Sequence, residues 1–408
     1  MSDVAAVRSY ARSFDGRVAD VLPAAARRVP ALRRRVADAG VAPHELIDTA
    51  SLDRVPILTK DGLLDLQRAD PPFGGVLDPD ARISRIFQSP GPLYEAELEG
   101  NDHWRWGSAL AAAGFTADDV VLNAFGYHLS PAGAMFEEAC RALGATVVPG
   151  GVGNLDLQVR ACADLGVTAY VGLPSYLKAL LERAEAAGHD PRAWPLARAF
   201  VSAEPLPPSL RTWLAGRVAV VRQGYGTAET GNLGFESSAV DGLHVPDDAL
   251  VQVCDLSTGA ARYDGGDGQV VVTILHARAP VVRFGTGDLS AWATDEAGDA
   301  SIATPRIRGW LGRVGDAVKV RGMFLHPRQV QQVMTGLDDV DAYRFVVDRV
   351  DHRDVLRCEL VPAGAADVGA LRSAVRERVR SGLRFDVEVT AVGELPDDAR
   401  ITDVRTWD

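Results

Sequence analysis

Short apolar runs alternate with longer segments between residues 118 and 226, and the apolar residues of the longer segments recur every three or four positions. The short runs have the length and composition of buried strands, and the longer segments, several ending in Gly, are typical of helices. This alternation predicts parallel strands covered by helices, a doubly wound α/β sheet. The expected strands are 119–125, 145–150, 168–174, 196–204 and 218–226, and the expected helices are 131–144, 154–166, 175–188 and 207–217.

The pattern changes after residue 240. Runs at 249–256, 268–275 and 279–290 predict a small antiparallel β part, with a hairpin turn at 265–268. The tail has the order strand, helix, strand, strand, helix, strand (317–322, 326–336, 341–350, 355–362, 368–382, 386–392), which predicts a small α+β, ferredoxin-like domain. We therefore expect a large N-terminal domain at 1–315 and a C-terminal domain at 316–408.

The N-terminal segment carries an apolar stripe at helical spacing, formed by Val7, Tyr10, Phe14, Val18 and Val21. The segment is rich in arginine, as transit peptides are, but acidic residues interrupt it at positions 3, 15 and 20. We interpret it as a structural helix and expect a cytoplasmic protein.

The chain of 408 residues carries a net charge of −12, from 43 basic and 55 acidic residues. An acidic chain is a poor candidate for non-specific binding to nucleic acid or to anionic membranes, which requires a basic surface. No apolar run approaches the roughly 18 residues of a membrane span. The four cysteines (Cys140, Cys162, Cys254, Cys358) are widely spaced, which argues against a zinc site or a disulfide framework.

Polar, glycine-rich and aromatic residues follow each expected parallel strand. They stand at 127–128, 150–154, 174–176, 202–205 and 224–229. Ligands of doubly wound sheets bind outside the carboxyl ends of the strands, so these five segments predict a binding site at one rim.

Three segments in order identify a resemblance: QGYGTAETGNLG at 223–234, RFGTGDL at 283–289 and GRVGDAVKVRG at 312–322. With further matching pieces from about residue 80 onward, the chain resembles the adenylate-forming superfamily, and within it the phenylacetate–CoA ligase-like branch. The resemblance implies an enzyme that joins a carboxylic acid to ATP, releases pyrophosphate and passes the acyl group to coenzyme A. It implies ATP, Mg²⁺ and coenzyme A as ligands, a 1–315 core that binds ATP and acid, and a mobile 316–408 lid.

The resemblance also assigns roles to residues. Glu229 is the expected Mg²⁺ ligand and catalytic carboxylate, which suits a hard cation. Tyr225 is expected against adenine, Asp288 at the ribose hydroxyls and Arg313 at ribose and phosphate. The remaining expected nucleotide-binding residues are Ser202, Ala203, Glu204, Gly226 and Thr227. Lys319 and Arg321 are either contacts of coenzyme A phosphates or a solvated strand face.

The acid pocket is expected among Phe125, Tyr127, His128, Pro174 and Tyr176. Aromatic and apolar walls with a few polar tips suit a small aromatic or apolar carboxylic acid. Each of these aromatic residues could equally belong to the core.

The chain departs from the family pattern at several places. The phosphate-binding loop, commonly Ser/Thr/Gly-rich and ending in Gly-Lys, is here FQSPGPLYE at 87–95, which leaves Ser89 and Gly91 as expected phosphate contacts. Arg400 stands where the C-terminal lysine is expected, and we assign it that catalytic role. Gly315 occupies the hinge position, where glycine permits a wide range of backbone angles.

Three hypotheses remain at this point. The first is an AMP-forming acid–CoA ligase. The second is an adenylating enzyme that passes the acyl group to an amine or a carrier protein. The third is a non-catalytic nucleotide-binding member of the family. The sequence leaves a homodimer open and does not identify the acid.

Overall fold

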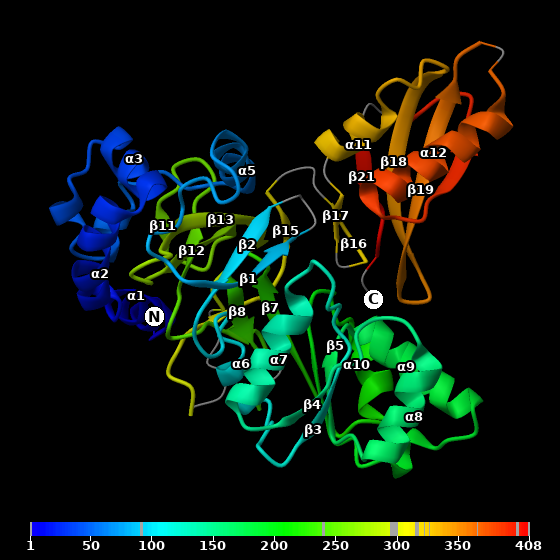
Figure 1. Ribbon diagram of the computed structural model, residues 1–408, viewed down its shortest axis with the longest axis horizontal. Helices are drawn as coiled ribbons and strands as arrows, with labels where there is room; N and C mark the ends of the chain where they lie inside the picture. Colours follow the sequence, from blue (N-terminus) through cyan, green and yellow to red (C-terminus); the bar gives the residue numbers. More distant parts are fainter. Residues whose placement is uncertain are drawn as a thin grey trace. The chain divides into compact units, whose positions relative to one another are not determined.

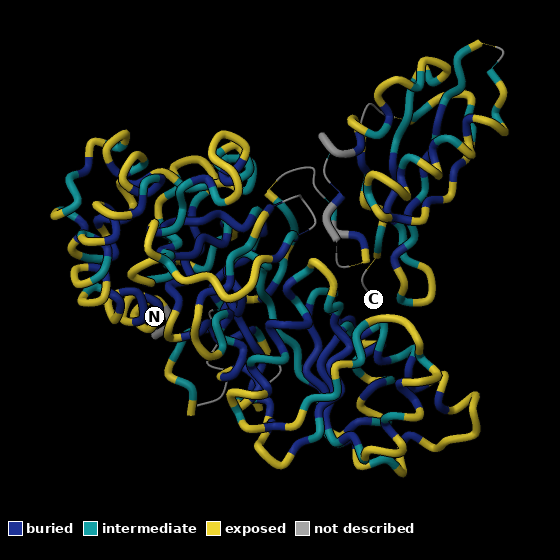
Figure 2. Tube along the Cα trace, in the orientation of Figure 1, coloured by how far each residue is buried: buried dark blue, intermediate teal, exposed yellow. Residues whose placement is uncertain are grey.

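The computed structural model describes residues 2–89, 93–238, 241–293, 301–314, 318–321, 323–325, 327–364, 366–396 and 400–406. The chain forms two compact units. The first contains Met1–Leu206 and Arg211–Val314, and the second contains Pro207–Leu210 and Gly315–Asp408. Each unit has its own hydrophobic core (Figure 2).

The larger unit is built around an eight-stranded sheet (Figure 1). Five strands are parallel to one another, and three antiparallel strands extend the sheet beyond β7. In spatial order they are β4 (Thr146–Val148), β3 (Val120–Asn123), β5 (Ala169–Gly172), β6 (Arg198–Val201), β7 (Val220–Thr227), β8 (Gly231–Phe235), β9 (Leu243–His244) and β14 (Arg306–Ile307). The expected α/β fold with a mostly parallel, doubly wound sheet is confirmed.

The strand order reverses between β3 and β5, because the chain leaves β3 for β4 on one side and returns to β5 on the other. Right-handed connections then place the helix after β3 and the helices after β4 and β5 on opposite faces. The packing agrees, since α6 packs on α7 and α8 packs on α9. These helices are α6 (Gly107–Ala112), α7 (Ala132–Ala142), α8 (Leu155–Leu165) and α9 (Pro174–Ala186), and α10 (Pro208–Ala215) precedes β7.

A five-stranded antiparallel sheet follows in the same unit. Its order is β11 (Ala261–Arg262), β10 (Leu250–Cys254), β12 (Gly268–Ile274), β13 (Val281–Ser290) and β15 (Gly312–Arg313). The N-terminal helices α1 (Ser2–Arg12), α2 (Asp15–Arg28) and α3 (Pro30–Asp38) share a core with this sheet. The expected N-terminal helix is thus two helices that separate at Ser13 and Phe14, and four of its five stripe residues are buried.

Shorter elements connect these parts. They are η1 (Pro43–Glu45), α4 (Thr49–Leu52), α5 (Lys60–Ala69), the hairpin of β1 (Ile83–Gln88) and β2 (Tyr94–Leu98), and η2 (Pro191–Ala193).

The smaller unit is α+β, but its strands pair differently from the expected order. Its sheet is β20 (Glu388–Ala391), β19 (Arg353–Pro362), β18 (Val340–Val350) and β21 (Ile401–Asp403), with α11 (Pro327–Met334) and α12 (Val368–Leu383). The expected first strand instead forms β16 (Val318–Val320) and pairs with β17 (Met323–Leu325) in a separate hairpin. The cause is a tight turn that begins at Arg321, which has a left-handed φ of 48°. The three-residue β21 takes the place beside β18.

All four cysteines are buried free thiols. Among the described residues, no helix combines the length and the apolar character that a membrane crossing requires.

Candidate active site

Tyr225, Asp288 and Arg313 converge from three strands. The Tyr225 hydroxyl donates to Oδ2 of Asp288 over 2.8 Å, and Nε of Arg313 lies 3.0 Å from Oδ1 of the same carboxylate. Arg313 and Asp288 are direct neighbours across β15 and β13. The indole of Trp310 also donates to Oδ1, over 3.0 Å. Asp288 is 4% exposed, so its buried charge is balanced by one cation and two neutral donors.

Burial and the neighbouring charge of Asp288 raise the pKa of Tyr225 well above its ordinary value. The tyrosine therefore stays neutral at any physiological pH and acts as a hydrogen-bond donor. The structure thus brings together the three residues expected at adenine, ribose and phosphate.

Close backbone packing explains the glycines of the motif. A Cβ on Gly224 would lie 2.6 Å from the ring of Phe200, and one on Gly226 would lie 2.6 Å from Trp106 and overlap the carbonyl oxygen of Gly231. Gly231 itself has a φ of 68°. Only glycine fits where backbones approach this closely.

A segment ahead of α6 holds the chain around Glu229. The indole of Trp104 donates to the carbonyl of Ala228 over 3.2 Å, and the guanidinium of Arg105 donates to the carbonyl of Thr230. The backbone N–H of Asn232 donates to the carbonyl of Trp104 over 2.9 Å. The backbone on both sides of Glu229 is therefore fixed.

Glu229 lies in an ion pair with a lysine that the sequence motifs do not indicate. Nζ of Lys60, at the start of α5, is 2.7 Å from Oε1 of Glu229, whose side chain is 6% exposed. Oε2 of Glu229 is buried and has no hydrogen-bond partner among the described residues. Burial raises the pKa of Glu229, but the Lys60 ammonium and the hydrogen bonds from Lys60 and Thr227 outweigh burial and lower it below its ordinary value.

A second carboxyl group, Glu95 on β2, lies close to Glu229. Burial and the neighbouring charge of Glu229 together raise the pKa of Glu95 to about 8, against the opposing effects of Lys60 and of the hydrogen bond from Ser89. Ser89, on the other side of the expected phosphate loop, donates to Oε1 of Glu95 over 3.3 Å. Ser89 is thus placed beside Glu95.

These groups fit a magnesium ion. The unpartnered carboxylate oxygen of Glu229 is the kind of donor that Mg²⁺ prefers, and Mg²⁺ commonly takes only one or two protein carboxylates and fills its other positions with water and substrate phosphates. No cluster of three or more His, Cys, Asp or Glu side chains suited to a metal occurs in the part of the chain that the structure describes. Thr227 lies next to Glu229, and its hydroxyl is 2.9 Å from that of Thr230.

The loop after β6 carries the other expected nucleotide residues. The Ser202 hydroxyl donates to the carbonyl of Gly224 over 2.8 Å, which ties this loop to the Tyr225 strand. Ala203 has a φ of 70°, a left-handed conformation that is uncommon for alanine. The Glu204 carboxylate accepts from the amide of Ser175 over 3.4 Å.

The expected acid-pocket residues lie in the loop after β3 and in the first turn of α9, which follows β5, at the reversal of strand order. Phe125 is buried and stacks on Phe136 with 4.6 Å between ring centroids. The Tyr127 hydroxyl accepts from Asn123 over 2.8 Å, and the Tyr176 hydroxyl donates to the carbonyl of Gly153 over 2.9 Å. Pro174 is buried at the start of α9, and His128 is exposed.

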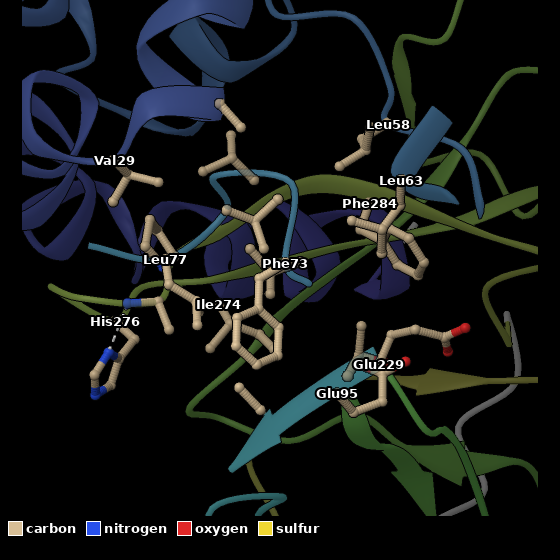
Figure 3. A pocket seen from close by; sticks show the side chains of 18 of the residues that line it. Val29, Leu58, Leu63, Phe73, Leu77, Glu95, Glu229, Ile274, His276 and Phe284 are labelled. Atoms are coloured by element: carbon tan, nitrogen blue, oxygen red, sulfur yellow. Dashed lines mark hydrogen bonds between the residues drawn. The ribbon is translucent and has the colours of Figure 1, made fainter. Parts of the chain in front are cut away.

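Glu229 also lines a cavity. Its open space is about 1070 Å³, part of it continuous with solvent. Figure 3 shows Glu95 and Glu229 together in one part of it and Val29, Leu77 and His276 in another. Most of its lining is apolar and comes from α3 and Val29 just before it, from α5 and the segment after it, and from β13. Of the five expected acid-pocket residues, all described, none lines this cavity.

The remaining expected residues belong to the smaller unit or lie outside the described residues. The guanidinium of Arg400 donates to the Tyr343 hydroxyl and lies 4.8 Å from that ring's centroid. Arg321 donates through Nε to the carbonyl of Asp354 over 2.9 Å. Gly91, Gly315 and the side chain of Lys319 lie outside the described residues.

Sequence reasoning missed Lys60, Trp310 and the 102–106 segment. One signal for Lys60 exists in the sequence, since it is one of only three lysines in the chain.

Comparison with known proteins identifies relatives of this chain. Residues 102–273 match the AMP-binding enzyme family. The chain is 31% identical to the phenylacetate–coenzyme A ligase of Thermus thermophilus, over 90% of this chain and 89% of the relative. It is 27% identical to the Escherichia coli protein of that name, over 90% and 88%. A solved structure of 2-hydroxyisobutyryl-CoA ligase in complex with 2-HIB-AMP and CoA superposes on this chain with a TM-score of 0.87. Its sequence is 25% identical, and the match covers 98% of this chain and 90% of that chain.

Proposed function

The chain belongs to the phenylacetate–coenzyme A ligase family of AMP-binding enzymes, and on that premise we propose that it activates a small aromatic or apolar carboxylic acid as the acyl-adenylate and transfers the acyl group to coenzyme A. That it is an AMP-forming acid–CoA ligase follows from the relatives themselves, which span about nine tenths of the chain. ATP and coenzyme A are accordingly its ligands. The hypothesis of a non-catalytic family member is thereby set aside.

The observation that carries the proposed site is the convergence of Tyr225, Trp310 and Arg313 on the buried carboxylate of Asp288. In the proposed function, Asp288 accepts hydrogen bonds from the ribose hydroxyls, and Arg313 contacts ribose and phosphate. Tyr225 packs its ring on adenine, and its hydroxyl holds Asp288 in place. The fixed backbone around Glu229 orients its carboxylate before the nucleotide binds, so little reorganisation is needed during reaction.

Adenylation brings two anions together, because the acid's carboxylate attacks the α-phosphate. Its catalysis is therefore mainly positioning and charge neutralisation. Glu229 would hold Mg²⁺, which when bound supplies positive charge to the phosphates. Arg400 is proposed to contribute the cation that contacts the carboxylate and the α-phosphate.

The substrate class rests on the residues after β3 and β5. Phe125, Tyr127, Pro174 and Tyr176 supply aromatic and apolar surface where doubly wound sheets bind ligands. One relative is named for phenylacetate, an aromatic acid of this class, while the name of the solved structure specifies 2-hydroxyisobutyrate, a small acid that also carries a hydroxyl group.

A mass-spectrometric screen tests the proposal. The purified protein is incubated with ATP, Mg²⁺, coenzyme A and a panel of aromatic, short aliphatic and long-chain acids, and acyl-adenylate, AMP and acyl-CoA are quantified together. We expect all three products with at least one small aromatic or aliphatic acid. Turnover confined to long-chain acids would contradict the substrate class. Acyl-adenylate that passes to an amine or a carrier protein, and not to coenzyme A, would contradict the acceptor.

A further inference from the structure

The chain meets almost every need for positive charge with arginine. Of its 43 basic residues, only Lys60, Lys178 and Lys319 are lysines. Lys178 forms an ordinary i,i+4 pair with Glu182 on α9. An ammonium differs from a guanidinium in being compact, strongly hydrated and able to turn its three N–H groups toward any acceptor. Where this chain has a lysine at a site, the lysine therefore indicates a use for these properties of the ammonium.

Lys60 lies at the first position of α5, directly after the capping residue Thr59, whose hydroxyl accepts from the amide of Gly62 over 3.0 Å. This end of a helix carries partial positive charge from unpaired amides, which adds to that of the ammonium. The Lys60 side chain is 27% exposed, while that of its partner Glu229 is 6% exposed. Lys60 thus pairs with a buried carboxylate while part of its own side chain remains accessible to solvent.

The phosphate loop of this chain lacks a cation of its own. The resemblance expects Gly-Lys at its end, but the loop ends in Glu95, a buried carboxyl group close to Glu229 (Figure 3). The nearby Arg105 is bound to the backbone, through the carbonyls of His103 and Thr230. The leaving pyrophosphate carries several negative charges and is expected beside the charged Glu229, so a cation supplied by another element would stabilise it there.

We propose that Lys60 is a nucleotide-binding residue for the β- and γ-phosphates of ATP, and that α5 supplies the cation which the phosphate loop has lost. The proposal rests on the proposed function. Without nucleotide, Lys60 neutralises Glu229. When ATP and its metal bind, Glu229 turns to the metal and the ammonium turns to the phosphates.

The reaction balances without any proton transfer to or from Lys60. An oxygen of the acid's carboxylate forms a bond to the α-phosphorus, the bond from that phosphorus to the bridging oxygen of the β-phosphate breaks, and pyrophosphate leaves with the electron pair. Lys60 remains an ammonium throughout and donates hydrogen bonds.

Comparing the binding of ATP with that of AMP distinguishes this role from a structural one, because AMP lacks the phosphates that Lys60 is proposed to contact. Binding of ATP with Mg²⁺ and of AMP to the full chain is measured by titration calorimetry for the wild type, Lys60→Met, Lys60→Arg and the control Lys178→Met. We expect Lys60→Met to weaken ATP binding about 10- to 100-fold, the scale of lost charge-assisted hydrogen bonds, and to change AMP binding less than threefold. Lys60→Arg should recover part of the loss, and Lys178→Met should match the wild type.

Two results would overturn the proposal: unchanged ATP affinity in Lys60→Met, or an equal loss for ATP and AMP, which would indicate that Lys60 only supports the fold. If Lys60→Met does not fold by thermal melting, Lys60→Gln, which keeps two N–H donors and removes the charge, replaces it with the same expectations. A wild type that binds neither nucleotide would contradict the proposed function, whereas an unaffected Lys60 variant contradicts only the role of Lys60.

Discussion

The Tyr225 hydroxyl lies 2.8 Å from Oδ2 of Asp288, so two residues assigned to different parts of the nucleotide form one hydrogen-bonded unit. Tyr225 lies in β7 of the eight-stranded sheet, while Asp288 lies in β13 of the five-stranded sheet. The bond therefore joins the two sheets at the site. Its consequence is that ring and hydroxyl of Tyr225 have separable tasks.

Tyr225→Phe removes only the hydroxyl. It should lower the free energy of unfolding by about 1.5–3 kcal/mol, the range for a hydrogen bond to a charged group, and leave AMP affinity within about threefold, because Trp310 and Arg313 still hold Asp288. Tyr225→Leu also removes the ring and should weaken AMP binding about tenfold or more, as expected for lost base stacking. Equal AMP affinities in the two variants would contradict the stacking role of the ring.

Glu229→Gln should reduce AMP formation by two to three orders of magnitude. It removes the charge that would hold the metal, and one such electrostatic contact is worth about 3–4 kcal/mol. The measurement is AMP release under saturating substrates, with circular dichroism to verify folding. Glu182→Gln, on the surface of α9, is the control and should keep wild-type rates. Near-normal turnover in Glu229→Gln would remove this residue from the mechanism.

Gly226→Ala tests the close packing of the motif. The new methyl group would overlap the Gly231 carbonyl and contact Trp106, so we expect a loss of stability of about 1–3 kcal/mol. Gly16→Ala on α2 is the matched control, because no atom lies within 4 Å of the added methyl and alanine favours helix. Chemical denaturation should show a lower midpoint for the first variant and an equal or higher one for the second. A neutral Gly226→Ala would contradict the packing.

Arg400→Ala should lower acyl-adenylate formation by about two orders of magnitude, the scale of a lost charge-assisted contact at a reacting group. Conversion of supplied acyl-adenylate to thioester should barely change, because the resemblance implies that the tail has moved away in that half-reaction. The exposed Arg380→Ala on α12 serves as control. If adenylation is unaffected, Arg400 is a surface residue held by Tyr343 and the cation comes from elsewhere.

Gly315→Pro addresses rotation of the smaller unit, which the resemblance implies. Proline fixes φ near −65°, so the variant should hold one pose and impair one half-reaction far more than the other. Adenylation and thioester formation are timed separately. An equal loss in both would place the hinge at another residue.

Much of the fold could be predicted because strands buried on both faces read as apolar runs, and the five parallel strands are confirmed. The resemblance and the enzyme class are confirmed as well. The pairing of β16 could not be predicted, because one left-handed turn at Arg321 decides whether that strand joins the sheet. β21 has only three residues, too few for a pattern.

The candidate site, like the fold, could be predicted only in part. Motifs of fixed spacing identify Glu229, Tyr225 and Asp288, because local backbone geometry places each of them. The Lys60–Glu229 pair joins an N-terminal helix to a loop far along the chain, and no local pattern encodes such a contact. The proximity of Glu95 to Glu229 likewise depends on how a hairpin packs on another sheet.

The central claim is that the acid's carboxylate attacks the α-phosphate of ATP, and oxygen labelling tests it most directly. The acid identified by the screen is prepared with both carboxylate oxygens as ¹⁸O and is converted to acyl-CoA by the purified protein, and the products are weighed by mass spectrometry. Because the bridging oxygen of the acyl-adenylate stays with phosphorus when the thiol attacks, the account predicts one ¹⁸O in each AMP and none in pyrophosphate. Unlabelled AMP, or ¹⁸O in inorganic phosphate beside ADP, would contradict it.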